Sequence, residues 1–184
     1  KWTGVLKEHN VFIRDEAGQE IQLSTDGREG NSYRRLEWSP DSTTIIAWRV
    51  EPGDRKEVHL LRSSPNGGGR VQLESRPYTL PGDKFSKFEP NLFDVASRKQ
   101  VKPEVDPFEH EWLAPRLSWS RDGRRFRYQQ VDRGHQRLRV IEVDAHSGAT
   151  HPLIDEKSDT FIWTAHTENL RLELVNWLEK TDDI

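Results

Sequence analysis

Apolar and polar residues alternate over short runs along this chain, and turn-forming residues separate the runs. The clearest case is the segment 117–156, where turn signals stand at 120–123 (SRDG), 132–134 (DRG) and 146–148 (HSG). Asp bonds to its own backbone in such turns, and Gly takes a positive φ without steric cost. The pattern predicts four strands in an antiparallel meander. The apolar pair Val140-Ile141 predicts burial on both faces, which requires neighbouring sheets.

The neighbouring sheets are predicted from repeats within the same chain. The segment 36–42 (LEWSPDS) repeats 117–123 (LSWSRDG), and 10–18 matches 139–148. Trp38 and Trp119 are 81 positions apart, about twice the ~40–45 residue period of a propeller blade. The sequence therefore predicts an all-β fold, a partial β-propeller of about three four-stranded antiparallel blades from a larger, eight-bladed type of ring.

The chain is predicted to be a single fragment, 1–184, of such a propeller. Its parts are a blade end (1–25, strands at 3–7, 11–15 and 20–24), an elaborated blade (33–103), a complete blade (117–156) and a blade start (160–184). In the elaborated blade, 45–48 and 58–61 are predicted as the central hairpin, 71–78 as an extended segment, and 91–95 with 100–102 as a further hairpin. The segment 63–115 holds seven of the ten prolines, and the remainder of it is predicted to leave the sheet. The segment 170–178 fits both a helix and a strand, and its context favours a strand.

Composition narrows the class of protein. Hydrophobic residues make up 33% and charged residues 32%, but seven Trp and seven Phe argue against disorder. The net charge of −3 gives no general attraction to nucleic acid or anionic membranes, and no apolar run approaches the ~18 residues of a membrane span. The absence of Cys excludes disulfides and thiolate metal sites. Because Met is absent as well, Lys1 is not expected to be the native start, and both ends are expected to be cut from a longer chain.

Several groups of residues could form a metal-binding or ligand-binding site, and each has a simpler structural explanation. Glu109-His110-Glu111 gathers possible metal ligands, yet in a strand only the two Glu would face the same way, so a solvated loop is favoured. The seven His show no metal-type spacing, and no metal or cofactor is predicted. Trp38 and Trp119 are predicted to pack between blades rather than to stack on a ligand.

The densest basic region could dock nucleic acid or an acidic partner. It comprises Arg121, Arg124, Arg125, Arg127, Arg133, Arg137 and Arg139. Because carboxylates at Asp122, Asp132 and Glu142 lie among them, a solvated, salt-bridged face is the favoured interpretation.

An ordered series of short motifs resembles one known family. The motifs are 8–15 (EHNVFIRD), 38–42 (WSPDS), 81–83 (PGD), 92–95 (LFDV), 133–136 (RGHQ) and 155–161 (DEKSDTF). Together they resemble the N-terminal β-propeller domain of dipeptidyl peptidase IV-like serine peptidases, in the prolyl oligopeptidase clan. The resemblance covers nearly the whole chain.

The resemblance implies a non-catalytic propeller that gates the access of peptides to a C-terminal α/β-hydrolase domain, and it favours a periplasmic or extracellular location. The sequence contains no Gly-x-Ser-x-Gly elbow, so no catalytic residue is assigned and the chain alone is not expected to be an enzyme. True dipeptidyl peptidases also carry two adjacent glutamates that bind the substrate's amino terminus. Here the corresponding segment, 26–35, holds only Glu29, so exopeptidase specificity is in doubt.

Two alternatives remain open at this stage. A TolB-like or WD-like propeller that acts as a protein-interaction scaffold, with no enzyme attached, fits the same strand pattern. An open arc of blades also exposes strand edges, which predicts a homodimer or strand exchange through those edges.

Overall fold

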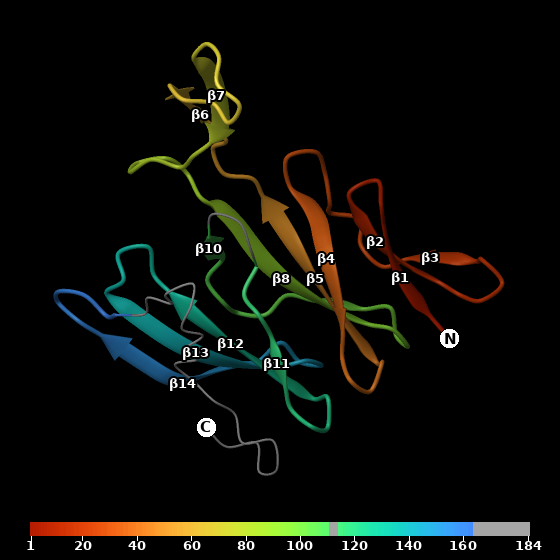
Figure 1. Ribbon diagram of the computed structural model, residues 1–184. Helices are drawn as coiled ribbons and strands as arrows, with labels where there is room; N and C mark the ends of the chain where they lie inside the picture. The colour runs from red at the N-terminus through yellow and green to blue at the C-terminus, as the bar shows by residue number, and fades with distance from the viewer. Residues whose placement is uncertain (111–113, 164–184) are drawn as a thin grey trace.

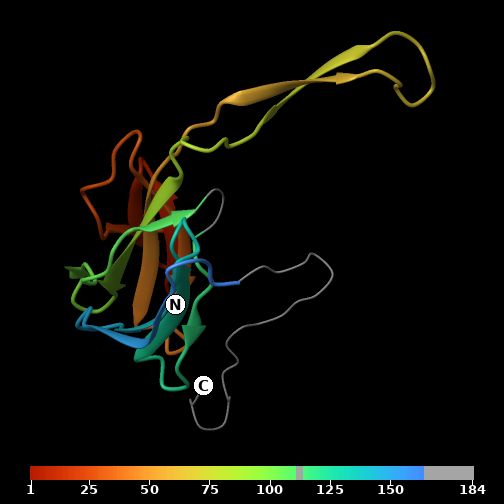
Figure 2. The same cartoon turned by 90° about the vertical axis from the view of Figure 1, so that its left-hand side faces the viewer.

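The computed structural model describes residues 1–110 and 114–163, and the regular elements within these ranges are all β-strands (Figures 1 and 2). They are β1 (Thr3–Lys7), β2 (Asn10–Arg14), β3 (Glu20–Gln22), β4 (Ser32–Trp38), β5 (Thr44–Glu51), β6 (Glu57–Arg62), β7 (Gln72–Pro77), β8 (Ser86–Asp94), β9 (Gln100–Val101), β10 (Phe108–His110), β11 (Ser118–Trp119), β12 (Arg125–Val131), β13 (Arg137–Asp144) and β14 (Thr150–Lys157).

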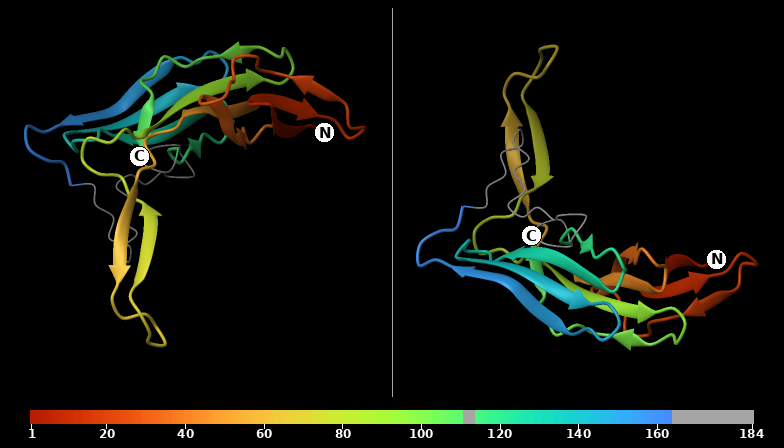
Figure 3. Two further views of the ribbon diagram at one scale, coloured as in Figure 1. Left: turned by 90° about the horizontal axis from the view of Figure 1, so that it is seen from above. Right: turned by 90° about the horizontal axis from the view of Figure 1, so that it is seen from below.

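The strands form three consecutive antiparallel sheets and one separate hairpin. The first sheet has the order β1-β2-β3, the middle sheet β10-β8-β5-β4 with β9 also paired to β8, and the last sheet β11-β12-β13-β14. The sheets stand side by side in chain order, and the β6-β7 hairpin projects away from them (Figure 3). The predicted fold class is confirmed: the described part of the chain is all-β and forms part of a propeller.

Two apolar cores fill the spaces between the sheets. Strand β5 supplies both, because its side chains point alternately to its two neighbours. Ile45 and Ala47 pack with Val11 and Ile13 of the first sheet. Ile46, Trp48 and Val50 pack with side chains of the last sheet that include Phe126, Tyr128 and Val143. Each sheet therefore keeps its neighbour's apolar face out of water, as the sequence predicted.

The repeated segments 36–42 and 117–123 form the same turn, one in the middle sheet and one in the last sheet. Ser39 N donates to Thr44 O at 2.9 Å, and Ser120 N donates to Arg125 O at 2.8 Å. In each turn the Ser hydroxyl donates to the Asp two residues later, Asp41 at 2.6 Å and Asp122 at 2.7 Å. These local bonds close the turn that leads into the second strand of each sheet.

The predicted central hairpin of the elaborated blade is wrong. Strand β5 pairs along its whole length with β8, from Thr44↔Asp94 to Glu51↔Lys87, and not with 58–61. The segment 58–61 lies in β6, which pairs with β7 in a two-stranded arm outside the sheet (Figure 2). Leu61 is 72% exposed, so its apolar character does not reflect burial. Strand β8 pairs with β5 instead, because this position buries its Phe88, Leu92 and Phe93.

Strand β8 contains Pro90, which sequence rules place at edges rather than inside a sheet. The structure accommodates Pro90 because the outer neighbour of β8 is split in two. Strand β9 pairs with Leu92 and Phe93, and β10 pairs with residues 86–88. Pro90 lies between these two pairings, at a position where β8 has no partner on its outer side.

The remaining predictions have mixed outcomes. The meander over 117–156 is confirmed by the pairing of β11 to β14, and the hairpin of 91–95 with 100–102 by the pairing of β8 with β9. Residues 108–110 were predicted to leave the sheet but form β10. The segment 160–163 is not a strand, and 170–178 lies outside the described residues. In the described part of the chain, no helix suited to crossing a membrane is present.

Candidate functional site

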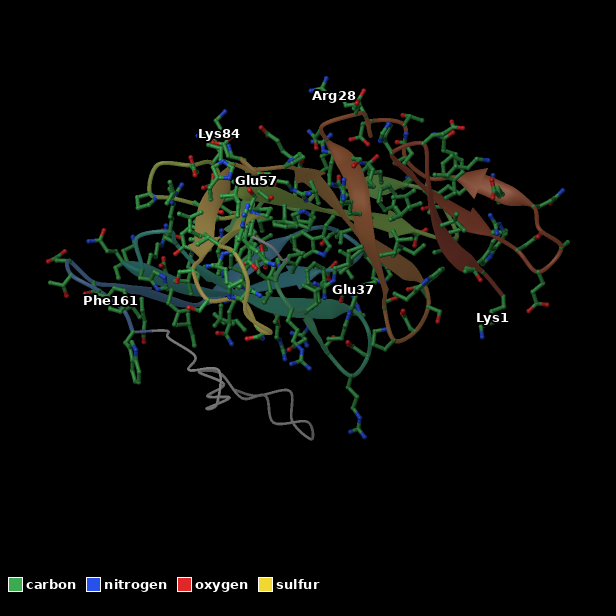
Figure 4. All side chains as sticks on the ribbon, turned by 45° about the horizontal axis from the view of Figure 1, so that its top comes forward. Lys1, Arg28, Glu37, Glu57, Lys84 and Phe161 are labelled. Carbon is green, nitrogen blue, oxygen red and sulfur yellow. The ribbon has the colours of Figure 1, made fainter. Side chains whose placement is uncertain are left out.

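The loop 26–31 is the first candidate site, because it occupies the segment where the resembled family carries its glutamate pair. It joins the first sheet to β4. Arg28 and Asn31 exchange backbone hydrogen bonds of 3.1 and 3.0 Å, and Gly30 takes a φ of 75° between them. Arg28, labelled in Figure 4, lies at the outer end of this loop. The loop is thus a tight turn, with Asp26 at its base.

The carboxylate of Asp26 is fully engaged by the middle sheet. The Tyr33 hydroxyl donates to one oxygen at 2.8 Å, and Arg49 Nη1 donates to the other at 3.0 Å. Burial would raise the pKa of Asp26, but the hydrogen bonds from Tyr33 and Gln100 and the charges of Arg49 and Lys102 hold it below its usual range. Asp26 is therefore ionised at neutral pH and already paired.

Arg49 is the centre of this arrangement. It binds Asp26 on one side and Glu89 on the other, where its Nε donates to Glu89 Oε2 at 2.9 Å. Its side chain is only 17% exposed. Lys102 adds a second cation, with its Nζ 3.4 Å from Asp26 Oδ2 and 3.8 Å from Glu89 Oε1. Two carboxylates are therefore neutralised by two cations.

Neutral side chains complete the arrangement, which we call the Arg49 cluster. Gln100 Nε2 lies 2.9 Å from both the Tyr33 hydroxyl and Asn91 Oδ1, and Asn91 is fully buried. Burial and the bond to Asp26 raise the pKa of Tyr33, so its hydroxyl remains a donor. The cluster consists of Asp26, Tyr33, Arg49, Glu89, Asn91, Gln100 and Lys102. It joins loop 26–31, the linker from the first sheet, to strands β4, β5, β8 and β9 of the middle sheet.

The charge balance of the Arg49 cluster decides whether its carboxylates can bind an ammonium group. An ammonium group is bound best by two carboxylates with unsatisfied acceptors. Asp26 and Glu89 instead have cationic partners within the protein. Glu29 is exposed and has no ion pair within the described residues. The loop therefore offers one solvated carboxylate in place of a pair.

The possible ligand group at 109–111 lies only partly within the described residues. Glu109 lies on β10 and its carboxylate is 3.7 Å from Lys87 Nζ. Glu111 lies outside the described residues. Among 1–110 and 114–163, no group of three or more His, Cys, Asp or Glu side chains could hold a metal ion.

The basic region of the last sheet is largely neutralised by carboxylates. Arg125 and Arg127 both pair with Glu142, at 3.4 and 2.7 Å. Arg137 pairs with Asp155 at 2.7 Å, and Arg139 with Asp106 and Asp132 at 3.0 and 3.1 Å. Arg133 lies over the Phe85 ring, 4.0 Å from its centroid. These contacts support the salt-bridged interpretation over a surface for nucleic acid.

Trp38 and Trp119 each pack against one of the two apolar cores between the sheets. Trp38 packs against the core of the first and middle sheets, and a Cβ on Gly4 of β1 would stand 3.5 Å from its Nε1. Trp119 packs against the core of the middle and last sheets, with its ring centroid 5.4 Å from that of Phe126. Both positions favour packing over ligand stacking.

Sequence reasoning missed the Arg49 cluster, although one signal was present. Arg49 is the single charged residue within the apolar run 45–50 (IIAWRV). A charge inside a strand buried on both faces requires a partner. Its carboxylate partners come from positions 26 and 89, and no local pattern connects those positions to it.

Comparisons with known proteins agree with this architecture. The family model described as the dipeptidyl peptidase IV (DPP IV) N-terminal region matches residues 2–183. The crystal structure of Porphyromonas gingivalis dipeptidyl peptidase 4 is similar with a TM-score of 0.59 at 15% identity, over 87% of this chain and 25% of that one. A putative dipeptidyl aminopeptidase IV from Bacteroides ovatus gives 0.55 at 12% identity, over 87% and 24%. No curated protein matches. The chain thus spans about a quarter of the length of these solved proteins, and at such identities the likeness shows the fold alone.

Proposed function

The chain belongs to the family of the dipeptidyl peptidase IV N-terminal region, and on that premise we propose that it is the non-catalytic propeller portion of a serine peptidase. In this proposal it limits the access of peptides to an α/β-hydrolase domain elsewhere in the parent chain. The observation that carries the proposal is the family match over residues 2–183, together with three sheets arranged as consecutive blades.

The physical basis for gating is the rigidity of adjacent blades. A shared core on each face of β5 holds the middle sheet against its neighbours, and the Arg49 cluster fixes the linker 26–31 to it. A ring built from such sheets has a fixed opening, so a substrate must pass it as an extended peptide. Folded proteins would be excluded by size alone.

The parent protein tests the assignment. We expect its complete reading frame to encode a Gly-x-Ser-x-Gly elbow in an α/β-hydrolase domain. We also expect it to cleave a chromogenic Xaa-Pro-anilide, which the 184-residue chain alone leaves intact. A reading frame that continues with further blades and then stops would favour the scaffold alternative and contradict the peptidase.

Gating is tested separately, by substrate size. One cleavable sequence is presented in a short peptide, in a long unstructured peptide and in a surface loop of a folded protein. Gating predicts that kcat/KM falls as the substrate becomes larger and that the folded protein resists cleavage. Equal cleavage of all three would contradict gating without affecting the peptidase assignment.

We further infer that loop 26–31 does not select a free amino terminus. Asp26 is paired with Arg49, and Glu29 alone lacks the second carboxylate that holds an ammonium. The parent enzyme is therefore expected to cleave a peptide and its Nα-acetylated form with similar kcat/KM. A loss of about a hundredfold on acetylation, equivalent to ~2.7 kcal/mol, would show that another part of the protein binds the amine.

A further inference from the structure

A pocket of about 130 Å³ lies at the base of the β6-β7 arm, where the chain leaves β5 and returns to β8. Since a water needs only ~10–15 Å³ of such volume, the pocket has room for one carboxylate and its methylene. Its walls come from β4, from the two segments that connect the arm, and from the start of β8. The lining residues are Arg34, Val50, Pro52, Gly53, Asp54, Arg55, Pro77, Tyr78, Thr79, Lys84, Phe85, Ser86 and Phe88. The pocket lies on the face of β4 opposite to Tyr33 and the Arg49 cluster.

The pocket carries excess positive charge. Arg34, Arg55 and Lys84 line it, and Asp54 is its one carboxylate. Within the described residues, none of these three cations has a carboxylate partner. Asp54 is engaged elsewhere: its Oδ2 lies 3.3 Å from Lys56 Nζ and accepts the Lys84 backbone N–H at 3.3 Å. This contrasts with the last sheet, where most of the arginines are paired.

Aromatic rings and backbone contacts give the pocket a defined shape. Phe88 is buried in the core, and Phe85 is held by Arg133 from the last sheet, 4.0 Å from the ring centroid. Tyr78 is half exposed on the opposite wall. The Gly53 N–H donates to the Ser86 hydroxyl at 3.1 Å and ties the two connecting segments together. The floor therefore belongs to the folded sheets, although the arm itself projects into solvent.

Position 53, where the two segments that connect the arm lie closest together, requires glycine. A Cβ on Gly53 would stand 2.3 Å from the Lys84 carbonyl oxygen. The outgoing and returning segments are thus in direct backbone contact. This contact holds Asp54 and Arg55 beside Lys84, which is labelled in Figure 4.

We propose that this pocket binds a carboxylate of a peptide, through Arg34, Arg55 and Lys84 and with the aromatic wall against the adjoining aliphatic part. Charge-assisted hydrogen bonds to carboxylates are about twice as strong as neutral ones, and Arg presents its donors in a fork that matches the two oxygens. The inference rests on the proposed function in one respect, since it takes the ligand to be a peptide. The carboxylate belongs either to an acidic side chain or to the C-terminus.

Calorimetric titration of the 184-residue chain with three peptides tests the proposal and separates the two sources. The peptides share their length and a free amino terminus. The first has one Glu and an amidated C-terminus, the second has Gln in its place and a free C-terminus, and the third has Gln and an amidated C-terminus. We expect the first or the second to bind at least about tenfold more tightly than the third, and added salt to narrow the difference. Whichever of the two binds more tightly identifies the source of the carboxylate.

Matched variants attribute the binding to this pocket. Arg34→Gln/Arg55→Gln/Lys84→Gln is expected to abolish the preference for the carboxylate. Lys99→Gln/Arg121→Gln/Arg124→Gln removes the same charge from turns at the opposite end of the strands and is expected to preserve it. Thr79→Glu, which places a carboxylate of the protein in the pocket while the cations remain, is expected to abolish it as well, and it serves if the triple variant does not fold.

Equal affinity for the three peptides, absence of binding, or loss of the preference in the control variant would overturn the proposal. Because binding is measured with no hydrolase domain present, this result is independent of the tests of the peptidase. A parent protein without a hydrolase domain would contradict the proposed function and leave the carboxylate site in place.

Discussion

At the scale of single residues, the two repeated turns differ at their last position, where a positive φ is occupied by Ser42 in one turn and by Gly123 in the other. Ser42 has a φ of 61° where its counterpart Gly123 has a φ of 72°. A Cβ on Gly123 would also stand 3.0 Å from Asp41 Cγ, in the neighbouring sheet. Gly123→Ala is therefore expected to lower the free energy of unfolding by about 1–2 kcal/mol, the cost of an L-residue in the left-handed region. Urea denaturation measures this change.

The same turn in the middle sheet provides the matched control. Ser42→Gly relieves the left-handed strain but adds conformational freedom to the unfolded chain. We expect a change within about 1 kcal/mol, in the stabilising direction. If Gly123→Ala were as stable as the wild type, the left-handed backbone at this turn would carry no energetic cost.

Asp94 gives the turns a dependence on pH. Its Oδ1 accepts bonds from the Ser97 hydroxyl at 2.5 Å and from the Ser97 N–H at 2.6 Å, and these bonds lower its pKa. Because the folded-state pKa lies below the unfolded value of about 3.9, the stabilisation is complete above that value and is lost as pH falls through the folded-state pKa. Asn accepts the same bonds without titrating. The stability difference between wild type and Asp94→Asn should therefore be constant from pH 7 to 5 and should shift against the wild type towards pH 3.

At the scale of elements, the Arg49 cluster adds polar contacts between β5 and the linker from the first sheet to the apolar contacts that β5 makes with both neighbouring sheets. Arg49→Gln would leave Asp26 and Glu89 with Lys102 as their remaining cation. Removing one partner of a buried ion pair is strongly destabilising, because the other charge stays desolvated. Since Arg49 is partly exposed, we expect a loss of about 2 kcal/mol, below the range for full burial. Chemical denaturation of the folded chain measures it.

Arg62 on the arm is the control for that substitution. It also pairs with a carboxylate, Glu74 at 2.6 Å, but the two side chains are 48% and 43% exposed. Arg62→Gln should therefore change the free energy of unfolding by less than about 0.5 kcal/mol. Equal effects of the two substitutions would mean that the Arg49 cluster acts as an ordinary surface pair.

A strand pairing could be predicted from the sequence where it depends on residues that are close together in the chain. The meander of β11 to β14 was predictable because each turn is closed by bonds within five residues, such as Ser120 N to Arg125 O. The partner of β5 was not, because two apolar segments follow it and alternation along the chain favours the nearer one, 58–61. The choice of β8 is decided by burial of Phe88, Leu92 and Phe93 between two sheets, which alternation along the chain does not reveal.

The same distinction applies to the candidate sites. The lack of a glutamate pair in loop 26–31 could be read from the sequence, since it concerns which residues are present. The Arg49 cluster and the cationic pocket could not be predicted, because each brings together residues from distant parts of the chain. In the pocket, Arg34 and Lys84 are 50 positions apart in the sequence, and the close backbone contact at Gly53 places Lys84 beside the start of the arm.

At the scale of the whole molecule, the described part is an arc of sheets with one projecting arm (Figure 3). The sequence predicted association through the exposed blade edges, and the structure adds a second surface. Leu61 and Leu73 stand directly opposite each other on the arm and are 72% and 68% exposed. An isolated two-stranded hairpin is marginally stable in water. A second copy of the chain would cover this apolar face and support the hairpin.

We therefore expect the chain to be a dimer at micromolar concentration by light scattering coupled to size-exclusion chromatography. Leu61→Lys/Leu73→Lys should give a monomer, because two charges would be buried without partners in the interface. Gln19→Lys/Gln72→Lys adds the same charge in the first sheet and on the other face of the arm, so it should remain dimeric. A dimer that survives the leucine substitutions would assign association to the blade edges instead. A wild-type chain that stays monomeric at high concentration would contradict both surfaces, and the arm would then have to be stable without a partner.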